Sequence, residues 1–233
     1  MTDIELLDKI PFTLDAERIL KTLRLRKPNE HIERTVRELV ERAQAVARPK
    51  AIYRVARVDC VEPDFVEIEG IRFTSRALSK NLESQNRVFP CIATCGRELE
   101  TLPIPADDVL QSFCFETIKT WALLAANQYL PVHLKQRFAV EKLSAMNPGE
   151  FQDWPITQQR QLFKLFPEAE AMIGVRLNES NVMIPMKSRS GIFFASEVGF
   201  VSCQLCTLKK CPGRQAKFSP EKVKEYTGVS PTT

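Results

Sequence analysis

The stretch IGVRLNESNVMIPMKSRSG, residues 173–191, decides the fold of this chain. Short apolar runs alternate in it with polar clusters, which is typical of strands joined by turns. Strands are predicted within and after this stretch, over 172–178, 182–186, 191–195 and 198–202. The polar, glycine-ended segment 187–191 is interpreted as a hairpin turn.

Helices are expected on both sides of these strands. Apolar residues recur at helical spacing in two stretches near the N-terminus, over 14–26 and 31–48. The longest helix candidate covers 106–130 and is expected to end at Pro131, because proline cannot donate the next helical hydrogen bond. A last helix is predicted over 220–226.

Between the first helices and the long one, the chain has a strand rhythm over 51–75 and 88–94. Helices, strands, a long helix and further strands thus follow one another, which predicts an α+β fold with a mainly antiparallel sheet flanked by helices. We divide the chain into an N-terminal helical region (1–50), a core (51–202) and a cysteine-containing tail with a final helix (203–233).

Composition narrows the class of protein. Of 233 residues, 44% are hydrophobic and 27% charged, which is ordinary for a soluble globular protein. No apolar run is long enough to span a bilayer, and the acidic N-terminus lacks a hydrophobic signal core, so we expect a cytoplasmic protein with no membrane partner. The net charge of +4 is scattered rather than gathered in a basic stripe with aromatics, so no nucleic-acid partner is expected.

Residues 144–202 resemble the C-terminal activation domain of cobalamin-dependent methionine synthase. The resemblance is carried by the Pro148-Gly149 turn, the segment 173–180 (IGVRLNES), the Met183-Ile184-Pro185 step and the segment 187–191 (KSRSG). These occur in the family's order and at similar spacing, including its S-x-S-G turn into an aromatic strand. The resemblance implies a curved antiparallel sheet flanked by helices.

That family's domain binds S-adenosylmethionine and docks onto a cobalamin-carrying domain, where it permits reductive methylation of inactive cob(II)alamin. The resemblance therefore implies that the partner is a corrinoid protein or methyltransferase, which carries the cobalamin. It implies that the ligand-binding residues of this chain are Asn147, Pro148, Gly149, Glu150, Trp154, Glu179, Lys187, Ser188, Ser190 and Gly191.

The sequence departs from the family at the segment that holds S-adenosylmethionine. The family reads R-x-x-P-G-Y there, and its arginine and tyrosine positions fall on Ala145 and Glu150 of this chain. An arginine could bind the methionyl carboxylate through two hydrogen bonds, whereas alanine cannot. Glu150 could instead attract a sulfonium or amino group.

Three of the seven cysteines lie within nine residues, in the pattern Cys203-x2-Cys206-x4-Cys211-Pro. Closely spaced thiols outside a secreted protein favour metal or redox chemistry over a disulfide framework. An iron–sulfur cluster or a structural zinc ion needs four ligands, so a distant residue must supply the fourth. Cys95 and Cys91 are the candidates, and we predict the set Cys203, Cys206, Cys211 and Cys95 for an iron–sulfur cluster, with zinc, a redox dithiol and inert thiols as alternatives.

Three functions remain open from the sequence. The first is an accessory protein that supports reductive reactivation of a corrinoid cofactor. The second is the S-adenosylmethionine-binding activation subunit of a split methionine synthase. The third is a non-catalytic corrinoid-protein binding module with a structural zinc site. No nucleophile–base pair, paired carboxylates or glycine-rich phosphate loop points to an independent hydrolase, kinase or dehydrogenase, so we expect an activation module rather than a complete enzyme.

Overall fold

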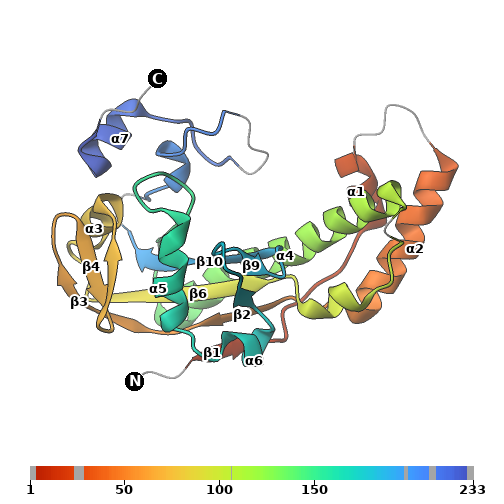
Figure 1. The fold of residues 1–233 in the computed structure, drawn as a ribbon, viewed down its shortest axis with the longest axis horizontal. Helices are drawn as coiled ribbons and strands as arrows, with labels where there is room; N and C mark the ends of the chain where they lie inside the picture. The colour runs from red at the N-terminus through yellow and green to blue at the C-terminus, as the bar shows by residue number, and fades with distance from the viewer. Residues whose placement is uncertain (1–3, 24–28, 106, 197–198, 210–213, 230–233) are drawn as a thin grey trace.

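The computed structural model describes residues 4–23, 29–105, 107–196, 199–209 and 214–229 (Figure 1). Groups of strands and groups of helices are interspersed along the chain. The strands are β1 (Glu5–Leu7), β2 (Lys50–Tyr53), β3 (Ala56–Val61), β4 (Phe65–Ile68), β5 (Ile71–Thr74), β6 (Arg87–Thr94), β7 (Leu143–Met146), β8 (Arg176–Leu177), β9 (Met183–Ile184) and β10 (Ser188–Ala195). The α-helices are α1 (Ala16–Leu23), α2 (Glu30–Val46), α3 (Arg76–Leu82), α4 (Val109–Phe138), α5 (Gln159–Lys164), α6 (Ala169–Ile173) and α7 (Pro220–Thr227). The short 3-10 helices are η1 (Arg97–Thr101), η2 (Ile156–Gln158) and η3 (Ser202–Gln204).

A curved antiparallel sheet is the centre of the molecule, which confirms the predicted α+β fold class. Among the described residues it follows the order β1-β2-β6-β3-β4-β5, and β10 joins it through β6. The long strand β6 therefore pairs with β2, β3 and β10. β7 pairs with the far side of β10, and the small β8–β9 hairpin stands apart from the sheet.

The helix α4 covers one face of the sheet and reaches beyond it to α1 and α2 (Figure 1). Its C-terminal half buries Ala126, Leu130 and Leu134 against sheet residues such as Tyr53 and Phe89. Its N-terminal half forms a second apolar cluster with α1 and α2. The N-terminal helices thus pack on α4.

The opposite face of the sheet carries the main core. α3, α5, α6 and α7 pack there, around the fully buried Trp154, whose ring meets Phe73 edge-on with centroids 6.4 Å apart. The tail contributes to the same core, because Leu205 and Tyr226 are buried in it. Residues before and after the segment 51–202 are therefore parts of the packed structure.

The expected helix end at Pro131 is wrong, because α4 continues through Pro131 to Phe138. An interior proline costs a helix about 3 kcal/mol. Here the last turns bury Leu134 completely and pack Phe138 against Phe89, with ring centroids 4.8 Å apart. Burial of such side chains contributes about 2 kcal/mol each, which offsets the cost of the proline.

The strands predicted around the deciding stretch are shorter than expected. Residues 172–173 end helix α6, and Gly174, with φ 71°, terminates it, so that only Arg176–Leu177 of the predicted strand 172–178 forms a strand. The strand predicted over 182–186 is reduced to Met183–Ile184. The strand predicted over 198–202 is absent from its described part, where Ser202 begins η3.

The turn predicted over 187–191 is also wrong. Residues 188–191 belong to β10 and pair with β6, with Ser188 opposite Thr94 and Gly191 opposite Cys91. Serine and glycine favour turns by composition. Here their small side chains instead permit neighbouring segments to approach the strand closely.

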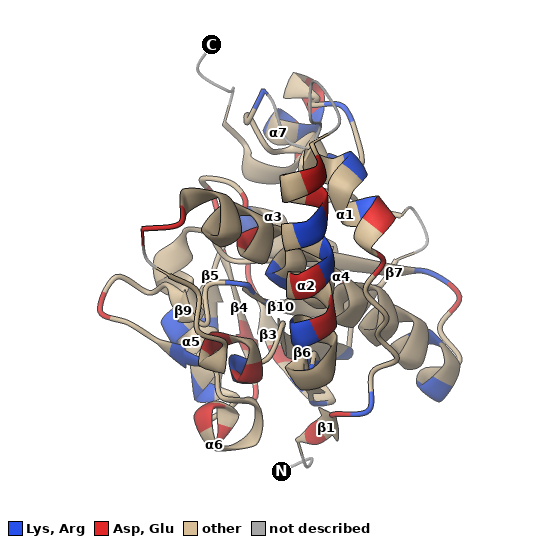
Figure 2. Cartoon of the chain, turned by 90° about the vertical axis from the view of Figure 1, so that its right-hand side faces the viewer, with Lys and Arg blue, Asp and Glu red and all other residues tan. Residues whose placement is uncertain are grey.

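Charged side chains of both signs alternate along α2 (Figure 2). Arg37 of α2 forms an ion pair with Glu17 of α1, so part of this charge ties the two helices together. No helix in the described ranges is sufficiently long and apolar to cross a bilayer.

Candidate functional site

A groove of about 410 Å³ lies where α4, β7 and β10 meet the segment 199–202. Three cations line it from three elements: Lys135 of α4, Lys142 just before β7 and Arg189 of β10. No aspartate or glutamate is found among its described lining residues. A cleft lined by charges of one sign concentrates ligands of the opposite sign, so this groove favours an anionic group.

Arg189 is held in place by two residues of the loop that follows β7. Its Nε donates to Asn147 Oδ1 at 3.1 Å, and its Nη2 donates to Glu150 Oε1 at 3.0 Å. Asn147 Nδ2 also donates to Glu150 Oε1, at 2.7 Å. The three side chains form a closed polar triad at the groove. Asn147 and Glu150 are thus brought together as predicted site residues, and Arg189 joins them.

The strand β7 leaves polar groups without partners beside the groove. Among the described strands it pairs with β10 alone, so its other edge is open. Ser144 in this strand is 3% exposed, and its Oγ has no hydrogen-bond partner; it lies opposite Phe194, on the face of the sheet that carries the main core. Across the groove, Pro131 has no N–H to donate to the carbonyl of Asn127 one turn earlier. Unpaired buried polar groups cost free energy unless a ligand or water satisfies them.

Two glycines give this region its shape. A Cβ built on Gly191 would collide with Asn147 Oδ1 and would lie 2.7 Å from the carbonyl oxygen of Met146. Gly149 has φ 89°, a backbone conformation that residues with a side chain rarely adopt, and its N–H donates to the Trp154 carbonyl at 2.7 Å. The polar triad therefore depends on glycine at both positions.

A second group of predicted residues lies on the opposite face of β10. Ser190 Oγ donates to Gln159 Oε1 at 2.9 Å, and Gln159 Nε2 donates to the carbonyl of Asn181 at 3.2 Å. Arg160 donates to the side chain of Asn181 and, at 2.9 Å, to the carbonyl of Glu179. The Glu179 side chain itself is exposed. These contacts fix the β8–β9 hairpin to α5, so the geometry gives Ser190 and Glu179 a structural role.

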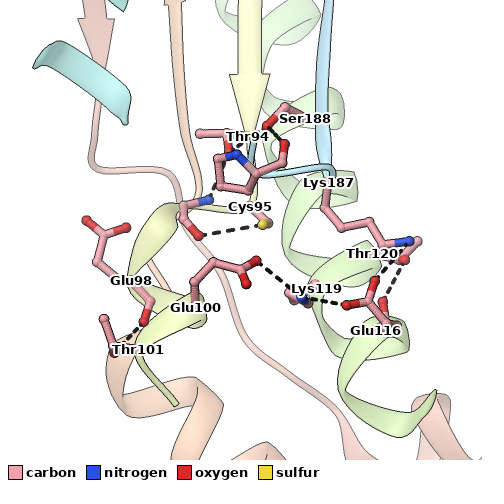
Figure 3. Close-up of polar contacts among 12 residues, drawn as sticks. Thr94, Cys95, Glu98, Glu100, Thr101, Glu116, Lys119, Thr120, Lys187 and Ser188 are labelled. Atoms are coloured by element: carbon pink, nitrogen blue, oxygen red, sulfur yellow. Dashed lines mark hydrogen bonds and ion pairs between the residues drawn. The ribbon is translucent and has the colours of Figure 1, made fainter. Parts of the chain in front are cut away.

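Figure 3 shows a third group, where β6 and β10 meet α4. Lys187 Nζ reaches Glu116 Oε2 at 3.5 Å, and the Lys187 carbonyl accepts the Cys95 N–H at 3.0 Å. The buried Lys119 lies between Glu116 and Glu100, with 3.1 Å from its Nζ to Glu100 Oε1. Burial opposes the charged form of Lys119, but its bonds to Glu116 and Glu100 outweigh burial and raise its pKa. This network of ion pairs ties η1, α4 and the start of β10 together.

Ser188 belongs to the same region. Its Oγ lies 3.0 Å from Thr94 Oγ1 and 2.7 Å from the carbonyl of Pro185. The structure therefore separates Lys187 and Ser188 from the triad of Asn147, Glu150 and Arg189, although Lys187 and Ser188 were predicted to share one ligand site with Asn147 and Glu150.

Pro148 and Trp154 are the remaining predicted ligand residues, and both are buried. Trp154 is 0% exposed, and its Nε1 has no hydrogen-bond partner. Its ring packs within the main core. The position of Trp154 makes it a packing residue under the Pro148–Gly149 loop.

The predicted cysteine ligands do not come together in the described part of the chain. Cys203 and Cys206 lie at η3 and just after it, partly exposed, and Cys211 lies outside the described residues. Cys95 is fully buried in the apolar cluster of α2 and α4, and desolvation raises its pKa to about 12. No group of three or more His, Cys, Asp or Glu residues able to hold a metal ion occurs among the residues described.

The segment around Cys203 and Cys206 is organised by Arg214. Its guanidinium donates to the carbonyls of Cys203 at 3.0 Å and Cys206 at 3.2 Å. The N–H of Gln215 points at Cys203 Sγ, at 3.4 Å. Gln215 and Ser202 also line the groove, so this segment borders it.

No family model matches the chain, and no curated protein matches it. Among solved structures, it is similar to the one titled "Crystal Structure of the MetH Reactivation Domain bound to AdoHcy". The match covers 97% of this chain and 85% of that chain, with a TM-score of 0.57 and 14% sequence identity. This chain has the fold of the MetH reactivation domain.

The structural likeness to the MetH reactivation domain extends far beyond the sixty residues that carry the sequence resemblance, because it covers 97% of the chain. At 14% identity it establishes the fold. AdoHcy is the ligand of that neighbour, whose fold this chain shares.

Sequence reasoning missed several residues of the groove. Arg189 occupies the variable position of the S-x-S-G pattern, so its pattern gave no reason to select it. Lys135 and Lys142 lie on either side of the α4–β7 connection, and only the fold brings both to β10. One feature of the sequence could have pointed to them: Ala145 stands where the resembled pattern has an arginine, so another cation would be needed to bind the same anion.

Proposed function

We propose that this chain is an accessory protein of a corrinoid-dependent methyl-transfer system and supports reductive reactivation of the corrinoid cofactor. The observation that carries the proposal is the likeness to the MetH reactivation domain over nearly the whole chain. The cobalamin would be carried by the partner, a corrinoid protein or methyltransferase. The chain would thus act as an activation module and would not catalyse a complete reaction alone.

The ligand proposed for the groove is S-adenosylmethionine or its product AdoHcy. The chain's own residues fit such a molecule, since the cationic side chains of Lys135, Lys142 and Arg189 suit a carboxylate. When bound, S-adenosylmethionine supplies a methyl group whose transfer makes an unfavourable reduction of the corrinoid irreversible. Asn147 and Glu150 would orient Arg189 for this ligand.

The first experiment measures ligand binding. The purified full chain is titrated with AdoHcy and with S-adenosylmethionine by isothermal calorimetry. The proposal expects saturable binding of at least one of them, together with a higher melting temperature, because a ligand that binds only the folded state stabilises it. Absence of binding by both ligands contradicts the proposed ligand.

The second experiment measures reactivation. The chain and S-adenosylmethionine are added, with a chemical reductant and without oxygen, to a corrinoid protein in the cob(II)alamin state. The expected result is conversion to methylcobalamin, followed by its absorption spectrum, at a rate that depends on the chain. A rate that is the same without the chain contradicts the accessory function.

We also propose that Cys203, Cys206 and Cys211 supply three thiolate ligands to an iron–sulfur cluster, which would deliver the activating electron. Their spacing supports this proposal, as do the donors that Arg214 and Gln215 direct toward the segment. The test is purification without oxygen, with metal analysis and an absorption spectrum. Iron with sulfide supports the cluster, whereas zinc supports a structural site in a corrinoid-protein binding module. A metal-free protein contradicts both.

A further inference from the structure

We propose that Arg189 holds the carboxylate of an amino-acid-type ligand in the groove between α4, β7 and β10. The inference rests on the proposed function, because it assigns one end of the ligand named there. Arg189 lines the groove, and 43% of its side chain is exposed. Its guanidinium is therefore both anchored and accessible.

The hydrogen bonds of Arg189 leave donors for a ligand. A guanidinium has five N–H donors in a fixed fork. Asn147 uses Nε and Glu150 uses one hydrogen of Nη2, so Nη1 remains for an incoming anion. An arginine that is already fixed by its neighbours loses little conformational entropy when it binds a carboxylate. The triad thus presents Arg189 in a prepared orientation.

A second observation points to an anionic ligand at the same place. Lys135 and Lys142 line the groove together with Arg189, and no aspartate or glutamate is found among its described lining residues. A cleft lined by charges of one sign concentrates ligands of the opposite sign.

The position of Arg189 also accounts for the altered loop sequence. Ala145 lines the same groove as Arg189 but cannot bind an anion. β7 and β10 are adjacent strands, with Ala145 opposite Phe193, so a cation from β10 can serve a ligand that lies along β7. Arg189 of β10 thus supplies the guanidinium that position 145 of β7 lacks.

The test compares two ligands that differ in the amino-acid part. AdoHcy carries the carboxylate, whereas 5′-methylthioadenosine has the nucleoside and thioether without it. Both are titrated into the full chain and into three variants: Arg189→Gln, Arg189→Lys and Arg72→Gln. Arg72 is the matched control, because it is also an exposed arginine in an ion pair, 2.9 Å from Glu67, but lies on β5.

Arg189→Gln is expected to weaken AdoHcy binding roughly 10- to 100-fold, the range for a lost charged hydrogen bond, and to leave methylthioadenosine binding unchanged. Arg189→Lys keeps the charge without the planar fork and should fall between Arg189→Gln and the wild type. Arg72→Gln should bind both ligands as the wild type does. Melting temperatures of all variants establish that they are folded.

The remaining outcomes separate the two proposals. If the wild type binds AdoHcy and Arg189→Gln binds it equally well, this inference is wrong while the proposed function stands. If Arg189→Gln weakens both ligands by the same factor, Arg189 does not act on the carboxylate and the inference is again wrong. If the wild type binds neither ligand, the proposed ligand fails and the inference fails with it.

Discussion

Arg189 Nη2 lies 3.0 Å from Glu150 Oε1, and this ion pair joins the strand β10 to the loop that follows β7. Neither residue is specified by the family pattern that residues 144–202 resemble. Glu150 stands where the pattern has a tyrosine, and Arg189 stands at the free position of S-x-S-G. The ion pair links these two positions, since each residue is the partner of the other.

The Arg189–Glu150 pair should contribute little to folding. Both side chains are partly exposed, 43% and 30%, so water screens the attraction. A double-mutant cycle with Arg189→Gln and Glu150→Gln should give a coupling of about 0.5 kcal/mol in the free energy of unfolding, measured by urea denaturation. A coupling above about 2 kcal/mol would show that the pair serves stability rather than ligand binding.

Ser144→Ala should separate stability from binding. The substitution removes a buried hydroxyl that has no partner, so the free energy of unfolding should stay the same or rise by up to about 1 kcal/mol. The affinity for AdoHcy should stay that of the wild type, because this hydroxyl lies on the core face of β7 and not in the groove. The matched control is Ser79→Ala, whose hydroxyl donates to the Glu62 carbonyl and whose loss should destabilise the protein. A destabilised Ser144→Ala would mean that its hydroxyl is bonded in solution.

Gly191→Ala should destabilise the protein strongly. The added Cβ would collide with Asn147 Oδ1 and the Met146 carbonyl, so β7 and β10 would have to separate locally. We expect a loss of about 2–3 kcal/mol in the free energy of unfolding. The control is Gly70→Ala, which has a positive φ of 73° but open space around its Cβ and should lose only about 1 kcal/mol. Equal losses in the two variants would argue against the collision.

Cys91 and Cys95 should be unreactive in the folded chain at pH 8. Burial raises the pKa of each thiol to about 12, so both remain protonated, whereas Cys203 and Cys206 are partly exposed. Alkylation with iodoacetamide and mass spectrometry should label Cys203 and Cys206 first. Rapid labelling of Cys95 would contradict its burial and would restore it as a metal ligand.

The raised pKa values of Cys91 and Cys95 also make the free energy of unfolding depend on pH. Their folded pKa lies above the unfolded value of about 8.5, so the folded state binds more protons between these values. Their contribution to stability is fully present below about pH 8.5 and is lost as the pH rises toward 12. The difference in the free energy of unfolding between the wild type and Cys91→Ala, measured by denaturant unfolding, should be smaller at pH 10 than at pH 7. A constant difference would disprove the linkage.

The fold class followed from the sequence because alternation and helical spacing are local patterns. The positions of α1 and α2 could be expected in this way, and so could the antiparallel sheet. The extent of α4 could not, because Leu134 and Phe138 hold the helix past Pro131 only through contacts with a distant part of the chain. Local propensity was overridden by burial.

The candidate site was only partly predictable for the same reason. Asn147 and Glu150 were found because their motif is local. Arg189 lies 42 residues from Asn147 in the chain, and its role depends on the pairing of β7 with β10. Lys187 and Ser188 lie away from Arg189, because the segment of serine and glycine that was interpreted as a turn is a strand whose side chains face opposite ways.

The helix α4 connects the groove with the N-terminal helices. Its 30 residues span roughly 45 Å, with the groove beside its C-terminal half and α1 and α2 on its N-terminal half. Pro131 cannot donate the helical hydrogen bond to the Asn127 carbonyl, and both residues line the groove. Interior prolines are a usual place for a helix to kink, so a ligand in the groove would lie against the turn of α4 from which this hydrogen bond is missing.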